Sequence, residues 1–354
     1  MGLGAILVIG AKSDPFVEGI GATDYQQTLF SGPLACAEIL GRSMTERMVE
    51  RLLRVEPDAI SVLVKTEASY QLPLFRNSFP KVSFEVVEDL ESALMLRLRD
   101  YSLQGIKRSF VQGAGAYTET DLMDFYYFHR EARQTATRAF DREGGLPLWV
   151  VDSAMPGQAD MSEALGVAGR NGVSYFVREY AHRLGHPRDL RGIAADILQG
   201  RCEKSATGKE IRPGVWVEEE AKIHRRARIV GPAYIGRRAK VRADTLITRC
   251  SSLERDCCVD YGTAIENSSL LPNTQVGIWL DVCHAIAHGN KLFSLGRNVG
   301  IEITDPSVMR STAPVFSRIA EVNDWNEARM SAADFEHEFL TQSTWQLGAN
   351  LIQE

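Results

Sequence analysis

The chain of 354 residues is long enough for two domains, and 44% hydrophobic and 24% charged residues are ordinary proportions for a globular protein. A formal net charge of −6 argues against a nucleic-acid partner, since nucleic-acid-binding proteins usually carry a basic balance. There is no run of eighteen apolar residues, and the six cysteines lack CxxC spacing. We therefore expect no membrane partner, no zinc site and a reducing, cytoplasmic location.

Short apolar runs alternate with amphipathic stretches over the first 200 residues. The apolar runs predict buried strands at 4–9, 59–64, 82–87, 109–112 and 148–151, with an edge strand at 173–177. Helical spacing predicts helices at 44–54 behind a Ser43/Glu46 capping box, at 89–101, after Thr118 as cap, and from Pro187 to Gly200. Alternating strands and helices indicate an α/β fold with a mainly parallel sheet.

A six-residue repeat follows, from Ile211 to Val276. The first position of all eleven hexapeptides is Ile, Val or Leu, and the fifth is small in all but the last. Neither a helix nor a strand has this period, so the repeat indicates a solenoid with aliphatic residues inside and small residues where its wall bends. It resembles the left-handed parallel β-helix of hexapeptide-repeat proteins, in which three hexapeptides form one triangular coil. Beyond Val276 the repeat breaks at 277–282, and we expect irregular last coils.

These patterns predict three parts of the chain. They are an α/β domain at 1–208, a left-handed β-helix at 209–305 and a C-terminal helical extension at 306–354, with a helix at 331–340. We also expect a homo-oligomer formed through the β-helix.

Three segments, in this order and followed by the β-helix, resemble the sugar-phosphate nucleotidyltransferases. Residues 33–53 are similar to that family's PKxxLPVxGRPLIERxLExL stretch, residues 109–129 to its strand, metal loop and helix, and residues 186–201 to its segment before the β-helix. The resemblance implies a Rossmann-like nucleotide-diphospho-sugar transferase domain that joins a nucleoside triphosphate to a sugar 1-phosphate and releases pyrophosphate. It places a nucleotide or sugar-phosphate ligand at Gly10, Ala11, Lys12, Gly113 and Gly115.

The charged groups of that family's site are not at the matching positions. Asp14 stands where the phosphate loop has its arginine, Leu34 where the family has a lysine, and Gly115 where it has the metal-binding aspartate. Phosphoryl transfer depends on cations and metal to offset charge in the transition state. We therefore expect a catalytically degenerate homologue with a binding or regulatory role, assign no catalytic residue, and expect Mg²⁺ only in an active enzyme. Lys12 is either a relocated phosphate-binding residue or a solvated surface residue.

Two further functions stay open. Many hexapeptide β-helices are acyltransferases with a histidine as general base, for which His284 and His288 are the candidates, while His224 should point outward. The other reading of both histidines is a surface or interface role, and no set of residues at ligand spacing suggests a metal site. A non-catalytic scaffold subunit is the remaining alternative.

The early hexapeptides are also rich in basic residues. They form either a patch for phosphate or an acidic partner, or a charged face that prevents edge aggregation. These residues are Lys222, Arg225, Arg226, Arg228, Arg237, Arg238, Lys240 and Arg242.

Overall fold

The computed structural model describes residues 2–10, 29, 33–66, 79–154, 174–203 and 206–313. The chain forms two compact units, Met1–Thr312 and Ala313–Glu354, and every element below belongs to the first. Ala11, Lys12 and the helix predicted at 331–340 lie outside the described residues. None of the helices in the described ranges is long and apolar enough to cross a membrane.

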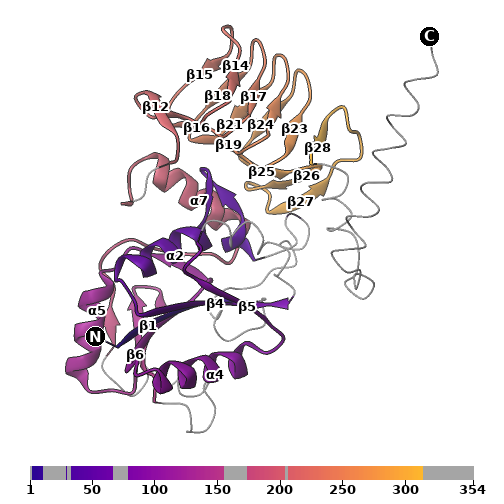
Figure 1. The fold of residues 1–354 in the computed structure, drawn as a ribbon. Helices are drawn as coiled ribbons and strands as arrows, with labels where there is room; N and C mark the ends of the chain where they lie inside the picture. Colours follow the sequence, from indigo (N-terminus) through magenta and orange to yellow (C-terminus); the bar gives the residue numbers. More distant parts are fainter. Residues whose placement is uncertain are drawn as a thin grey trace, which may run out of the picture. The chain divides into compact units, whose positions relative to one another are not determined.

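A seven-stranded sheet forms the centre of the α/β part, in the order β10-β8-β9-β6-β1-β4-β5 (Figure 1). β1 is parallel to both of its neighbours, β4 and β6, whereas β9 is antiparallel to β6 and β8. Every residue of β1 is buried, as expected of a parallel strand covered on both faces. The strands are β1 (Leu3–Ile9), β4 (Ala59–Lys65), β5 (Ser83–Val87), β6 (Arg108–Gly113), β8 (Ala136–Asp141), β9 (Gly144–Asp152) and β10 (Tyr175–Phe176).

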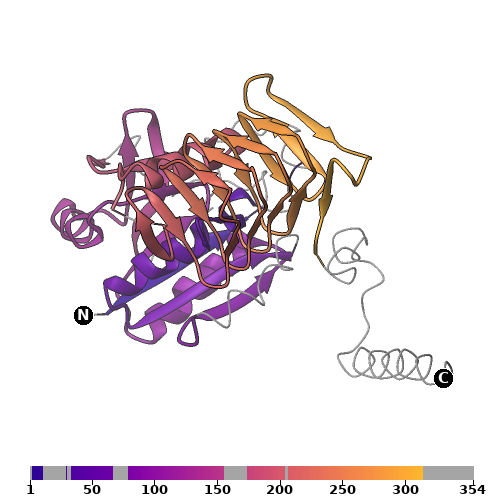
Figure 2. The same cartoon turned by 90° about the horizontal axis from the view of Figure 1, so that it is seen from above.

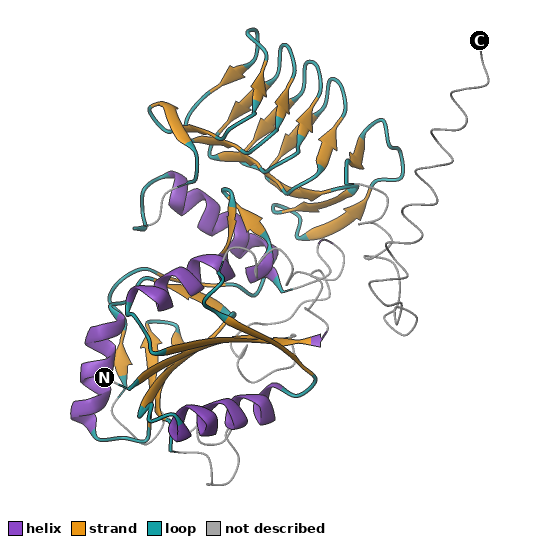
Figure 3. Cartoon of the chain, in the orientation of Figure 1, coloured by secondary structure: helices purple, strands orange, loops and turns teal. Residues whose placement is uncertain are grey.

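The helices cover both faces of this sheet, as Figure 3 shows. Leu7 and Ile9 of β1 share a hydrophobic cluster with α2 and α5, whereas Ile6 and Val8, which point to the other face, pack with α4. The predicted capping box of Ser43 and Glu46 is confirmed. The helices are α2 (Met44–Arg54), α4 (Leu90–Leu103), α5 (Leu122–Ala132) and α7 (Pro187–Leu198), with a 3-10 turn η2 (Leu34–Cys36).

The predicted cap of α5 at Thr118 is wrong. Thr118 ends β7 (Ala116–Thr118), which pairs antiparallel with β11 (Ala181–Arg183), so its backbone already belongs to a strand. Asp121 is the N-cap, and its carboxylate accepts hydrogen bonds from the backbone N–H groups of Met123 and Asp124 at 2.8 and 3.1 Å. An aspartate at this position satisfies two amides that have no partner within the helix.

The hexapeptide region consists of short strands stacked into three sheets, an arrangement consistent with a β-helix (Figure 2). Val215 pairs with Ala233 and Ala233 with Ser251, so the predicted spacing of 18 residues per coil is confirmed in the first coils. An α/β domain with a Rossmann-like sheet followed by a β-helix is thus the observed fold class; its left hand stays a prediction. The first sheet contains β13 (Val215–Val217), β16 (Ala233–Ile235), β19 (Ser251–Leu253), β22 (Ser269–Leu270) and β25 (Ala285–His288).

The other strands complete these sheets. The second sheet holds β14 (Lys222–Ile223), β17 (Lys240–Val241), β20 (Cys258–Val259), β23 (Thr274–Val276) and the antiparallel β28 (Met309–Ser311). The third holds β15 (Arg228–Ile229), β18 (Leu246–Thr248), β21 (Ala264–Glu266) and β24 (Asp281–Cys283). Antiparallel strands β12 (Lys209–Arg212), β26 (Lys291–Ser294) and β27 (Val299–Glu302) extend the first sheet.

The repeat departs from its predicted register at both ends. Ile211 is 48% exposed in β12 and does not begin a coil. At the other end Leu253 pairs with Leu270, 17 residues on, so one side of the prism is a residue shorter. The interior positions therefore continue as Leu270, Val276 and Val282, and the predicted interior residue Leu271 packs in the α/β cluster instead. The apparent break after Val276 is this one-residue shift.

Small residues fill the corners of the coils as predicted, and their polar atoms bond the bent backbone. Thr263 is fully buried; its hydroxyl donates to the carbonyl of Gly277 at 2.6 Å and accepts from the N–H of Leu280 at 3.1 Å. Cys257, also fully buried, points its Sγ at the carbonyl of Leu271 at 3.1 Å. Burial raises the pKa of this thiol, so Cys257 acts as a neutral corner filler.

Candidate functional site

The chain changes sides of the sheet at the carboxyl ends of β1 and β6. β1 lies between β4, which comes next among the strands of the sheet, and β6, which comes later. In open α/β sheets, ligands bind outside the carboxyl ends of the strands at such a switch point. Val8 pairs with Gly113, and the N–H of Ala114 donates to the carbonyl of Val8 at 3.0 Å. The structure thus brings Gly10, directly after β1, beside the end of β6.

Gly115, the third described residue of the predicted nucleotide site, is two residues beyond β6. Its carbonyl accepts a hydrogen bond from the N–H of Leu184 at 2.8 Å, next to the β7–β11 pair. Leu34 is only 2% exposed and packs in the hydrophobic cluster that also contains Ala114. The positions at which the family resemblance implies a metal-binding carboxylate and a lysine are therefore buried without a charge.

Within the described residues, no three His, Cys, Asp or Glu side chains lie close enough together to hold a metal ion. The residues at this switch point also do not fit a magnesium ion bound in the way the resemblance implies. Gly115 offers no carboxylate, and its carbonyl already accepts a hydrogen bond from the backbone.

A second polar centre, which sequence reasoning missed, lies where a hairpin of the α/β part meets the β-helix. The antiparallel pair β2 (Glu38–Ile39) and β3 (Arg42–Ser43) turns at Leu40 and Gly41, both of which have positive φ angles. The carboxylate of Glu254 accepts the N–H of Leu40 at 2.8 Å and that of Gly41 at 3.0 Å. Glu254 therefore holds both amides of the turn.

The turn is fixed from its other side as well. The guanidinium of Arg47 donates to the carbonyls of Ile39 and Leu40 at 3.2 and 3.3 Å, and the hydroxyl of Thr207 donates to that of Leu40 at 3.0 Å. Gly41 leaves no room for a larger residue, because a Cβ at this position would lie 1.9 Å from the Thr207 hydroxyl.

Glu254 is only 1% exposed, and burial raises the pKa of its carboxyl from 4.5 to about 8. The nearby carboxylates of Glu38 and Glu218 raise it further, while the two amide hydrogen bonds lower it. Glu38 also forms an ion pair with Arg255 at 2.8 Å. In the sequence, Glu254 occupies the second, outward position of its hexapeptide, so only its packing partner makes it a buried acid.

The two histidines of the acyltransferase alternative are held by different neighbours. His284 lies at a corner with φ of 50°, and its Nδ1 is 2.6 Å from the side-chain amide of Asn267. His288 ends β25, where its Nδ1 lies 3.2 Å from the carbonyl of Leu29. Acyl transfer by these residues stays a prediction.

The arginines of the early coils form ion pairs between neighbouring coils. Arg226 pairs with Asp244, and Arg238 pairs with Asp256 at 2.6 Å, in both cases 18 residues further on. Because these cations already face carboxylates of the next coil, the pairs favour the interpretation of this region as a charged protective face.

Comparison with known proteins gives fold-level similarity alone. No protein-family model matches the chain, and no curated protein matches it. A structure described as a glucose-1-phosphate thymidylyltransferase of Bacillus anthracis, in complex with sucrose, is similar with a TM-score of 0.43 and 10% identity, over 58% of this chain and 98% of that one. HddC from Yersinia pseudotuberculosis is similar with a TM-score of 0.40 and 14% identity, over 52% and 95% of the two chains, and its complex with GMP-PN gives 0.39 and 13% over 53% and 96%. At these values the similarity assigns no activity.

Proposed function

We propose that this chain is a sugar-phosphate nucleotidyltransferase-like protein that binds a nucleotide or nucleotide sugar and has lost most or all turnover. The observation that carries the proposal is the switch point at the carboxyl ends of β1 and β6, with Gly10, Gly113 and Gly115 at its edge. Glycines allow a diphosphate to approach the backbone closely, and backbone N–H groups are suitable phosphate donors.

The loss of turnover rests on charge. Leu34 is buried among apolar side chains, and Gly115 has no side chain at all. A triphosphate would therefore lack, from these two positions, the cation and the metal-binding carboxylate that stabilise the transition state of phosphoryl transfer. We further propose that the protein is cytoplasmic and forms a homo-oligomer through its β-helix, which light scattering after size-exclusion chromatography would measure.

Calorimetric titration of the full chain with UTP, dTTP, GTP and their glucose conjugates, with and without Mg²⁺, tests the binding. We expect at least one of these ligands to bind and Gly10→Val to weaken it about tenfold or more, because a side chain would occupy the space for the diphosphate. Gly296→Val is the matched control, since a Cβ there meets nothing within 4 Å. Absence of binding by all these ligands would refute the proposal.

A pyrophosphate-release assay with each triphosphate and glucose 1-phosphate tests the loss of turnover. We expect release at background level for the natural chain and measurable release for the double variant Leu34→Lys, Gly115→Asp, with circular dichroism to confirm folding. Rapid release by the natural chain would show that other residues supply the missing charge.

A further inference from the structure

The edge of the sheet farthest from the switch-point side of β1 carries an open groove. β5 is the last strand of the seven-stranded sheet and pairs only with β4 among the described strands. Three of its five residues, Ser83, Glu85 and Val86, are exposed. An edge strand presents unpaired backbone N–H and C=O groups and is usually protected by lysine, proline or a bulge. β5, with the sequence SFEVV, contains neither lysine nor proline.

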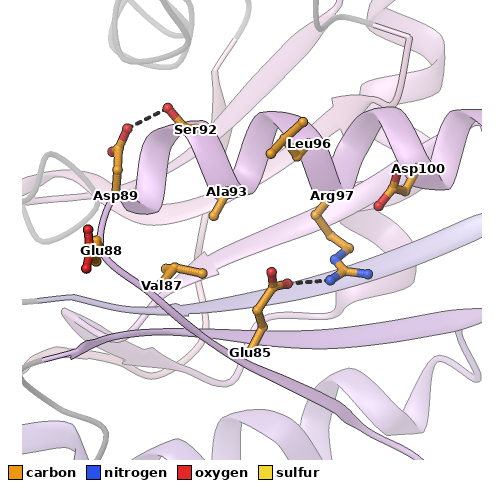
Figure 4. A pocket seen from close by; sticks show the side chains of 9 residues that line it. All are labelled: Glu85, Val87, Glu88, Asp89, Ser92, Ala93, Leu96, Arg97 and Asp100. Carbon is orange, nitrogen blue, oxygen red and sulfur yellow. Dashed lines mark hydrogen bonds and ion pairs between the residues drawn. The ribbon is translucent and has the colours of Figure 1, made fainter.

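A groove of about 510 Å³ lies between β5 and α4 (Figure 4). Glu88 and Asp89 stand at one end of it and Asp100 at the other, all of them exposed. Arg97 and Glu85 form an ion pair across the middle. Because Arg97, the cation of the groove, already faces a carboxylate, three of its four carboxylates remain to attract a positively charged partner.

Apolar surface accompanies these charges. Val86 on the strand is 46% exposed and Leu96 on the helix is 61% exposed. Lysine and arginine side chains combine an aliphatic stem with a charged head, so they match a groove that has apolar walls and carboxylates at its ends.

We propose that β5 and α4 form a docking groove for an extended, lysine- or arginine-bearing segment of a partner protein, which adds to the sheet as an eighth strand. Backbone hydrogen bonds to β5 give the affinity, and the carboxylates select basic side chains and speed association.

Charge decides between the occupants that this edge could take. A second copy pairing through its own β5 would place Glu85 and Glu88 against identical carboxylates, and like charges directly opposite are destabilising. The chain's own residues 313–354 carry seven Asp and Glu (Glu321, Asp324, Glu327, Asp334, Glu336, Glu338, Glu354) against two Arg (Arg318, Arg329), so they are repelled as well. A basic segment of another protein is the occupant that the groove attracts.

Fluorescence anisotropy with labelled nine-residue peptides tests the proposal on the full chain at low salt. We expect the basic peptide VKVKVKVKV to bind and the acidic peptide VEVEVEVEV to bind at least about 30-fold more weakly. A basic peptide that is N-methylated at alternate residues, and so cannot pair as a strand, should bind about tenfold more weakly or less. Equal binding of the basic and acidic peptides, or full affinity of the methylated one, would overturn the proposal.

Charge reversal locates the site. Glu88→Lys combined with Asp100→Lys should weaken binding of the basic peptide about tenfold or more, since each reversal replaces an attraction by a repulsion. Glu131→Lys, an exposed change of the same sign on α5, is the matched control and should alter binding less than about twofold. If Glu131→Lys weakens binding as much as the groove variant, the attraction comes from net charge and the groove is not the site.

Discussion

The contact between Glu254 and the Leu40–Gly41 turn makes stability depend on pH in a way that one substitution should remove. The pKa of Glu254 in the folded chain is raised from 4.5 to about 8, so folding favours the protonated carboxyl. The stabilisation from this group is fully present below pH 4.5 and is lost as the pH rises through about 8. Glu254→Gln, which is nearly isosteric with the protonated form, should not show this loss.

The magnitude follows from the shift. One pKa unit corresponds to about 1.4 kcal/mol, so the shift of Glu254 corresponds to roughly 5 kcal/mol at most between pH 4.5 and 8. The two chains should be similarly stable at pH 5. At pH 8.5 we expect the free energy of unfolding of the variant to exceed that of the natural chain by roughly 2 to 5 kcal/mol, because the variant has no buried charge facing Glu38 and Glu218.

Urea unfolding followed by tryptophan fluorescence at pH 5, 6, 7 and 8.5 measures this difference. Hydrogen exchange of the peptide that spans residues 38–43 gives a local reading, because the amides of Leu40 and Gly41 donate to Glu254. In the natural chain their protection should fall as pH rises beyond what intrinsic exchange explains. Glu131→Gln, at an exposed carboxylate, is the control and should leave the pH dependence unchanged.

A difference between Glu254→Gln and the natural chain that stays within about 0.5 kcal/mol from pH 5 to 8.5 would refute the reasoning. It would mean that the amides of the turn compensate the charge of Glu254 fully, and that burial at this contact carries no penalty for ionisation.

Two further substitutions test the geometry of the contact and of the coils by urea unfolding. Gly41→Ala should cost about 2 to 4 kcal/mol, because its Cβ would lie 1.9 Å from the Thr207 hydroxyl. Gly105→Ala, at the same φ of 84° but with nothing within 4 Å, should cost only the left-handed backbone strain of about 1 kcal/mol, and equal losses would contradict the packing argument. Thr263→Val should cost about 1 to 3 kcal/mol, because it leaves the buried N–H of Leu280 without its acceptor; a neutral result would mean that the corner relaxes.

Local pattern predicted most of the elements. The apolar run at 4–9 and the helix at 44–54 have the expected limits within a residue, since burial on both faces and a capping box each leave a direct mark in the sequence. The hexapeptide period likewise predicted the stacked coils, because every coil must fill the same narrow interior with one aliphatic residue per side. Here composition and period are themselves the physical cause of the structure.

Errors arose where two local patterns fitted equally well. Thr118 and Asp121 are both good capping residues, and the pairing of β7 with β11 decided between them. Leu270 and Leu271 are both aliphatic and adjacent, so the sequence alone allowed either to enter the prism. The stacking of Leu270 on Leu253 chose the first and turned the second toward the α/β cluster.

The sequence by itself determined that an α/β domain precedes a hexapeptide solenoid, and that two charged positions of a nucleotidyltransferase-like site hold leucine and glycine. Only the tertiary structure placed Gly10 beside the end of β6, made Glu254 a buried acid, and left β5 as an open edge between carboxylates. The reason is the range of the interactions: periodicity and capping act over a few residues, whereas Glu254 lies 214 positions from Leu40, whose amide it binds. Burial of that acid exists only once the coil and the hairpin have met.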